Sequence, residues 1–259
     1  MLQAVFSIPP EKRESIAPFF FHGSGLVMSC LDGCMGQAFG DHPFRPEAAL
    51  LCVGDFACFG GDPNRHAARQ LAGKLALEKG KTWLVPVLEG WEEHLTFWHP
   101  IRMERSVRYV VTRNREFDKA KLLEIAKSIP PGFALHSIDK ALYEKAMANE
   151  WSRDFCSQFQ SGEDYAKRGL GVVALRGEEL AAGASSYVIY NGGIEIQTDT
   201  REDMRRRGLA AACCAQLILN CLQKGLLPSW DAANPASLAL AQKLGYALKA
   251  PYDIWEVAF

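Results

Sequence analysis

The most informative stretch of the chain is TREDMRRRGLAA, residues 200–211. A strand-like segment precedes it, a helical pattern follows it, and small residues stand where that helix begins. Such a corner directs several backbone N–H groups into one space, where the helix dipole also favours an anion. Gly208 and Ala210 leave the backbone accessible, and the arginines at 205–207 add positive charge. The stretch predicts a phosphate or pyrophosphate site, although a solvated charge cluster before a helix has the same composition.

Two other phosphate-binding patterns are missing from the sequence. The chain contains no Gly-x-x-x-x-Gly-Lys-Ser/Thr, and no Gly-x-Gly-x-x-Gly follows a strand-like segment. Those patterns hold nucleoside triphosphates and dinucleotides, so both ligand classes are disfavoured.

The residues around the stretch predict a meander followed by alternating helices and strands. Asn191-Gly192-Gly193 is a tight-turn signal between two of the predicted strands. The predicted strands are 171–175, 180–190, 194–200, 229–232 and 252–259, and the predicted helices are 138–155, 208–224 and one that begins at Asn234-Pro235.

The first half of the chain alternates helical and strand-like segments without a clear repeat. Helices are expected at 66–78 and 119–127, and strands at 83–88 and 107–112. Ser128-Ile129-Pro130-Pro131-Gly132 is the best boundary, because prolines and a glycine stop a helix. We therefore expect two domains, 1–130 and 131–259.

Two segments resemble signatures of the GNAT acyltransferase superfamily. Arg205-x-x-Gly208-x-Ala210 resembles its Gln/Arg-x-x-Gly-x-Gly/Ala motif, and NPASLALAQKLGY, residues 234–246, is similar to its second signature. The resemblance covers roughly the half after Pro131. The residues at 221–222 and 228–234 look most like the two-domain group associated with resistance to zwittermicin A.

The resemblance implies a fold, a co-substrate and a set of binding residues. The fold would be α+β, with a mixed, mostly antiparallel sheet flanked by helices in the C-terminal domain and a mixed α/β N-terminal domain. Acetyl-CoA would be the donor, with no metal. Its pantetheine arm would lie along Thr198, Asp199 and Thr200, its pyrophosphate on Arg205, Arg206, Arg207, Gly208, Leu209, Ala210 and Ala211, and its other side against Asn234 and Ser237.

The catalytic groups are harder to assign. Many superfamily members place a tyrosine acid seven residues after the helix-leading Asn, whereas this chain has Ala241, and packing is the expected role of Tyr246. Glu195 is a candidate base, or else an exposed strand carboxylate. Asp231 could bind a cationic amine, or fix the turn before Asn234. All six histidines precede the acetyltransferase-like strands.

Composition limits the partners of the protein. The 259 residues carry 29 basic and 30 acidic side chains, a net charge of -1, which offers no global field for nucleic acid or an anionic membrane. No apolar run approaches the about 18 residues that a membrane span needs. We expect a cytoplasmic protein, a small-molecule amine such as an antibiotic, polyamine or amino-acid-like compound as acceptor, and allow for a homodimer.

Several weaker signals have a plain packing interpretation. Cys30, Cys34, Cys52 and Cys58 could be read as zinc ligands, but their spacing favours packed free thiols. Cys58 with His66 could form a nucleophilic pair, for which no local signature exists. Aromatic residues at Trp91, Trp98 and His99 could line a pocket or belong to a core cluster.

Two further function classes stay open beside direct acetyl transfer to an amine. A non-catalytic sensor of acyl-CoA would need the coenzyme site without an acid at position 241. An interaction protein that uses only the fold would bind no coenzyme.

Overall fold

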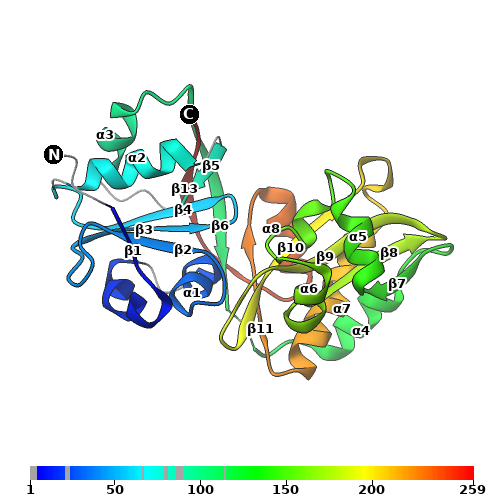
Figure 1. Ribbon diagram of the computed structural model, residues 1–259. Coiled ribbons are helices and arrows are strands. Elements are labelled where there is room, and N and C mark those ends of the chain that lie inside the picture. Colours follow the sequence, from blue (N-terminus) through cyan, green and yellow to red (C-terminus); the bar gives the residue numbers. More distant parts are fainter. Residues whose placement is uncertain (1–4, 21–23, 66, 79–80, 86–89, 114) are drawn as a thin grey trace. The chain divides into compact units, whose positions relative to one another are not determined.

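The computed structural model describes residues 5–20, 24–65, 67–78, 81–85, 90–113 and 115–259 (Figure 1). The chain forms two compact units, one of Met1–Arg108 with Pro251–Phe259 and one of Tyr109–Ala250. These limits differ from the predicted domains: residues 109–130 belong to the second unit, and the end of the chain returns to the first. The prolines at 130 and 131 follow a helix within the second unit rather than separating the two.

Unit 2 is built on a five-stranded sheet of order β11-β10-β9-β8-β7. All neighbours are antiparallel except β10 and β11, which are parallel. The predicted meander is present, and Gly192 makes its tight turn with a φ of 81°. The strands are β7 (Ala134–Ser137), β8 (Gly171–Arg176), β9 (Glu179–Tyr190), β10 (Gly193–Thr200) and β11 (Leu227–Ser229).

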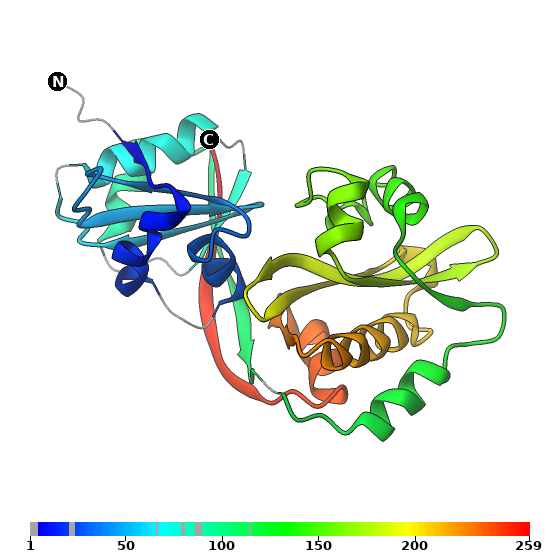
Figure 2. The same cartoon turned by 60° about the horizontal axis from the view of Figure 1, so that its bottom comes forward.

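Helices cover both faces of this sheet (Figure 2). One face carries α4 (Lys119–Lys127) and α7 (Leu209–Gln223), and the other carries α5 (Lys140–Met147) and α6 (Gly162–Arg168). The core lies between the sheet and α7, whose Cys213, Leu217 and Cys221 are completely buried, as the spacing of four predicts. The helix predicted over 138–155 ends already at Met147, and a separate 3-10 turn, η2 (Arg153–Phe155), follows it; α6 was not predicted.

The strand predicted at 229–232 is two strands in different sheets. β11 ends at Ser229 beside β10, and β12 (Asp231–Ala232) pairs with Val110 and Tyr109 of β6. The chain changes partners at Trp230, whose buried ring packs edge-on against Tyr246. α8 (Pro235–Lys243) then begins at the Asn234 cap, and β13 (Leu248–Ala258) leaves the unit.

The sheet of unit 1 has the order β1-β2-β3-β4-β5-β13-β6, and β12 follows β6 as its last strand. The helix predicted at 66–78 is found at 68–78, and the strand predicted at 107–112 is part of a longer strand at 102–111. Residues 86–88 of the strand predicted at 83–88 lie outside the described residues. The elements are β1 (Phe6–Ser7), η1 (Pro10–Phe19), α1 (Gly25–Leu31), β2 (Gln37–Gly40), β3 (Ala48–Val53), β4 (Phe56–Gly61), α2 (Ala68–Glu78), β5 (Lys81–Leu84), α3 (Trp91–Phe97) and β6 (Arg102–Val111).

Several of the weaker sequence signals of unit 1 lie on packed residues, whereas His99 is exposed. All eight cysteines are free, and the described residues contain no group of three His, Cys, Asp or Glu side chains that could hold a metal ion. Trp91 is completely buried and stacks on Phe59 at 4.6 Å between ring centroids. His66, the suggested partner of Cys58, lies outside the described residues. Within the described part of the chain, every helix is too short or too polar to cross a membrane.

Candidate functional site

The parallel strands β10 and β11 pair only over the first three residues of β10. Gly193, Ile194 and Glu195 of β10 lie opposite the three residues of β11. From residue 196 to residue 200, the strand neighbour of β10 in the described structure is β9 alone. One edge of β10 therefore has no strand partner over these five residues in the described structure, although Thr200 N already donates to Asp199 Oδ1 and Thr200 O accepts from Arg205 Nε. Glu195 stands where the opening begins.

The loop after β10 has an unusual backbone. Arg206 has a φ of 64° and Gly208 a φ of 82°, so two residues out of three adopt the left-handed conformation, which costs an L-residue other than glycine about 1–2 kcal/mol. Alternating conformations of this kind turn successive N–H groups toward one point and form an anion-binding concavity.

The amino end of α7 adds further donors to the same loop. Its first intrahelical bond runs from Ala212 N to Gly208 O at 3.1 Å, so the amides of residues 209–211 precede the helical ladder. No side-chain cap accepts from them, since the N-cap is Gly208. A Cβ added at Gly208 would meet no atom within 4 Å. The space beside Gly208 is therefore open, and the first amides of α7 have no side-chain acceptor at the cap, which suits an anion.

The three arginines of the loop differ in what they contact. Arg205 Nε donates to Thr200 O at 3.2 Å, and Arg207 Nη2 donates to Asp203 O at 3.5 Å. Arg206 is exposed and forms no hydrogen bond or ion pair with any residue that the structure describes. Its guanidinium is the cation best available to a ligand.

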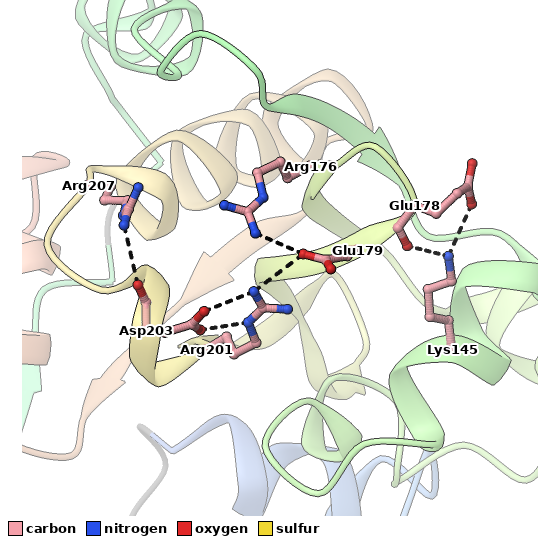
Figure 3. Close-up of polar contacts among 7 residues, drawn as sticks. All are labelled: Lys145, Arg176, Glu178, Glu179, Arg201, Asp203 and Arg207. Atoms are coloured by element: carbon pink, nitrogen blue, oxygen red, sulfur yellow. Dashed lines mark hydrogen bonds and ion pairs between the residues drawn. The ribbon is translucent and has the colours of Figure 1, made fainter.

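An ion-pair network holds the beginning of this loop to the β8–β9 hairpin (Figure 3). Arg201 donates to both carboxylate oxygens of Asp203, at 2.7 and 3.0 Å, and lies 3.5 Å from Glu179. Arg176 donates to the same Glu179 oxygen at 3.0 Å. The hydrogen bond from Arg201 lowers the pKa of Asp203, and that from Arg176 lowers the pKa of Glu179. These carboxylates stay charged and fix the turn η3 (Glu202–Met204) that leads into the loop.

The side chains predicted along β10 point into the protein or along the strand. Thr198 Oγ1 donates to Gly183 O at 2.9 Å, and Asp199 Oδ1 accepts from Thr200 N at 2.6 Å. Their hydroxyl and carboxylate groups are engaged, so binding at this edge would use backbone groups, as the resemblance implies.

Asn234 and Ser237 also have structural partners. Asn234 Oδ1 accepts from Ser237 N at 2.9 Å and caps α8, as the sequence predicts. Ser237 Oγ accepts from Trp230 Nε1 at 3.1 Å.

Glu195 is buried, with 8% of its surface exposed, so the expectation of an exposed strand carboxylate is wrong. It lies in β10 between β9 and β11, and strands on both sides exclude water. Burial raises the pKa of Tyr190, and the neighbouring charge of Glu195 raises it further. Tyr190 in turn shares a 2.5 Å hydrogen bond with Ser229 and accepts from Arg113 at 3.1 Å.

This polar cluster was not predicted from the sequence. Arg113 follows β6, Tyr190 ends β9 and Ser229 ends β11, so only the sheet brings them together. No motif or spacing in the sequence links the three residues.

The other catalytic candidates are placed as follows. Asp231 is half-buried in β12, opposite Val110. Tyr246 is 3% exposed, donates its hydroxyl to Pro228 O at 2.7 Å and packs edge-on against Phe117, which confirms a packing role. Ala241 is completely buried. In unit 2 the single histidine, His136, lies on β7 at the opposite edge of the sheet from β11.

A separate open cavity of about 510 Å³ lies in unit 1, between η1 and the segment after β2. None of its lining residues is among those that the sequence predicts for a site. They are Ile8, Glu11, Lys12, Glu14, Ser15, Pro43, Phe44 and Pro46.

The chain is similar to a known protein family and to a curated protein sequence. The family model described as GNAT acetyltransferase matches residues 19–255. The uncharacterized N-acetyltransferase YdfB of Bacillus subtilis is 30% identical over 129 residues, which are 49% of this chain and 49% of that protein. The chain therefore spans about half the length of the curated relative that it matches.

Solved structures resemble the whole chain. A GCN5-related N-acetyltransferase-like protein from Streptococcus suis is 37% identical, has a TM-score of 0.87, and matches over 95% of this chain and 98% of its own. A tandem GNAT protein from the clavulanic acid biosynthesis pathway has a TM-score of 0.58 over 98% of both chains. At 14% identity that second likeness concerns the fold alone.

Proposed function

This chain belongs to the GNAT acetyltransferase family, and on that premise we propose that it transfers an acetyl group from acetyl-CoA to a primary amine of a small molecule. The observation that carries the proposal is the loop before α7, where Arg206 and Gly208 have left-handed backbones, the helix amides have no side-chain cap, and the Cβ position of Gly208 is open. A pyrophosphate matches this arrangement in charge and in its number of acceptor oxygens.

The rest of the co-substrate would follow the open edge of β10. The pantetheine arm carries amide groups, which can pair with the backbone of residues 196–200 where β11 has diverged. The thioester would then lie near the beginning of the opening, beside Glu195. The amino end of α8, with Asn234 and Ser237, would form the second wall.

The proposed reaction needs no covalent enzyme intermediate. An ammonium substrate gives a proton to the Glu195 carboxylate, and the neutral amine nitrogen attacks the acetyl carbon. Backbone N–H groups of β10 stabilise the negative charge that develops on the thioester oxygen. The new C–N bond forms as the C–S bond breaks, the sulfur leaves as thiolate, and the proton on the new amide nitrogen is released to it.

One observation favours a second candidate function, a non-catalytic acyl-CoA sensor. Ala241 is buried where many family members have a tyrosine acid, and the Tyr246 hydroxyl is committed to a carbonyl. Release of free thiol from acetyl-CoA in the presence of an amine panel distinguishes the two functions. The resemblance to the zwittermicin A resistance group adds amino-bearing antibiotics to polyamines and amino acids in that panel.

Calorimetric titration with acetyl-CoA tests the binding assignment. Gly208→Asn keeps a residue that tolerates the left-handed conformation but adds a side chain in the space before the amides. Loss of even one charge-assisted hydrogen bond should weaken binding about tenfold or more.

Gly225→Asn is the matched control. Gly225 follows the other end of α7, has a φ of 69°, and also has no atom within 4 Å of an added Cβ. Its variant should bind acetyl-CoA as the unchanged protein does. Equal affinity of all three proteins would contradict a pyrophosphate site at Gly208.

A further inference from the structure

Units 1 and 2 have the same order of helices and strands. In unit 1, β1 is followed by the helical segments η1 and α1, strands β2, β3 and β4, helix α2, strand β5, helix α3 and a last strand. From β7 onward, the chain forms α5 and α6, strands β8, β9 and β10, helix α7, strand β11, the two-residue strand β12, helix α8 and a last strand, β13, which pairs with β5 in the sheet of unit 1. The sequence shows no repeat, so this correspondence is visible only in the fold.

The sheets also pair in the same way. The orders β1-β2-β3-β4-β5 and β7-β8-β9-β10-β11 each have three antiparallel pairings followed by one parallel pairing. In each unit the parallel strands meet at the beginning of the fourth strand, at Phe56 and Ala57 in β4 and at residues 193–195 in β10. A helix follows that fourth strand in both.

We infer that this chain contains one fold twice, and that only the second copy has kept a loop able to hold the coenzyme. The part that concerns the coenzyme rests on the proposed function. The loops after β4 and β10 occupy equivalent places in the two copies, and they differ in both backbone and charge.

The loop after β4 is filled by a side chain of its own. Asp62 Oδ1 accepts from the backbone N of Asn64 at 2.9 Å and from its Nδ2 at 3.0 Å. A carboxylate therefore takes the loop donors that a phosphate oxygen would need. In the second copy, the amides at 209–211 have no such side-chain acceptor at the cap.

The charges of the two loops are also opposed. Arg65, the one arginine between β4 and α2, pairs with Glu47 at 2.8 Å and lies 3.8 Å from Asp41. The guanidinium of Arg65 is therefore engaged by two carboxylates from the segment after β2, and Asp62 adds a negative charge to the loop itself, which repels a polyanion. The second copy has three consecutive arginines, of which Arg206 is exposed and forms no hydrogen bond or ion pair with the described residues.

The stoichiometry of coenzyme binding tests this assignment. Calorimetry with acetyl-CoA should give one site per chain, and Gly208→Asn should leave no second site of the original affinity. Two sites in the unchanged protein, or a tight site that survives Gly208→Asn, would overturn the assignment to the second copy alone.

A thermal melt without coenzyme separately tests whether Asp62 stabilises the loop after β4 in the first copy. Asp62→Ala should lower the melting temperature by about 2–4 °C, because the Asn64 donors lose their acceptor. Asp62→Asn keeps an acceptor oxygen and should melt close to the unchanged protein. If Asp62→Ala melts at the same temperature as the unchanged protein, the Asp62 carboxylate does not stabilise the loop after β4 and the inference about the first copy is wrong.

The two measurements separate the inference from the proposed function. If the unchanged protein binds no acetyl-CoA, the proposed function fails and the coenzyme assignment fails with it. The Asp62 melts still decide, by themselves, whether a carboxylate has taken the anion position in the first copy.

Discussion

Glu195 combines burial with a position at the end of the paired part of two strands. It lies opposite Ser229 in β11 and opposite Val188 in β9, and 8% of its surface is exposed. A carboxylate in such a place needs polar neighbours, and Tyr190 with its partners Ser229 and Arg113 supplies a polar cluster beside it. Burial with a directed polar environment is what a general base requires.

Glu195→Gln should reduce amine acetylation by about 10²–10⁴-fold at neutral pH. The loss should shrink as the pH approaches the pKa of the amine, because a neutral amine needs no base before attack. The measurement is kcat against pH for both proteins, with acetyl-CoA affinity by calorimetry as the check that the site is intact. A rate ratio that stays constant with pH would remove Glu195 from the proton transfer.

At the scale of single elements, the turn η3 depends on the ion pairs around Arg201. Asp203 and Glu179 bind this guanidinium from two different segments, one after β10 and one at the start of β9. The network links the loop before α7 to the β8–β9 hairpin of the sheet (Figure 3). Its expected role is to position the loop rather than to contact the reacting atoms.

Asp203→Asn should raise the Kd for acetyl-CoA roughly two- to fivefold, the effect expected of exposed ion pairs. The value of kcat at saturating co-substrate should not change. Glu178→Gln is the matched control, since Glu178 pairs with Lys145 of α5 at 3.3 Å on the same hairpin but does not contact the loop. Equal effects of the two variants on Kd would contradict a specific role for the Arg201 network.

The same variant has a predictable dependence on pH. Because hydrogen bonds from arginine lower the pKa of Asp203, its charged form favours the folded state. That contribution is complete above the ordinary aspartate pKa of about 4, and is lost as the pH falls through the lowered value. The difference in melting temperature between the unchanged protein and Asp203→Asn should be constant above about pH 5 and should narrow below about pH 4.

Helices and strands were predicted correctly where the sequence of the element itself shows a cap, a turn residue or a hydrophobic period. α4 begins at the Asp118 cap and has the predicted limits, and β9, β10 and α7 agree within one or two residues. β4 of unit 1 was not predicted, because FACFGG is buried along most of its length and shows no alternation. The division of 229–232 into two strands depends on two sheets, so the local sequence does not contain it.

At the scale of the whole molecule, the cysteines report on packing. Six of the eight are buried, and only Cys34 and Cys52 are half-buried. Burial raises the pKa of most buried thiols, to about 12 for Cys30, Cys156, Cys214 and Cys221. A protonated thiol is a poor nucleophile, so these side chains should be inert in the folded protein.

A chromogenic disulfide reagent at pH 8 should therefore react rapidly with no more than two thiols of the native protein. All eight should react after denaturation in guanidinium chloride. More than two rapid thiols under native conditions would show that the buried cysteines are accessible. Reaction of each cysteine can be followed by mass spectrometry of the labelled peptides.

The sequence by itself indicated a strand–loop–helix corner at 200–211, the cap at Asn234, the helix at 119–127 and the meander before the loop. These features depend on backbone conformation and spacing over a few residues, which neighbouring side chains dictate. Only the tertiary structure decided that Glu195 is buried beside Tyr190, that Arg113 reaches Tyr190 across 77 positions, and that β13 returns to unit 1. The repeated strand order was also hidden, because pairing between distant strands is set by the whole sheet and leaves no local pattern.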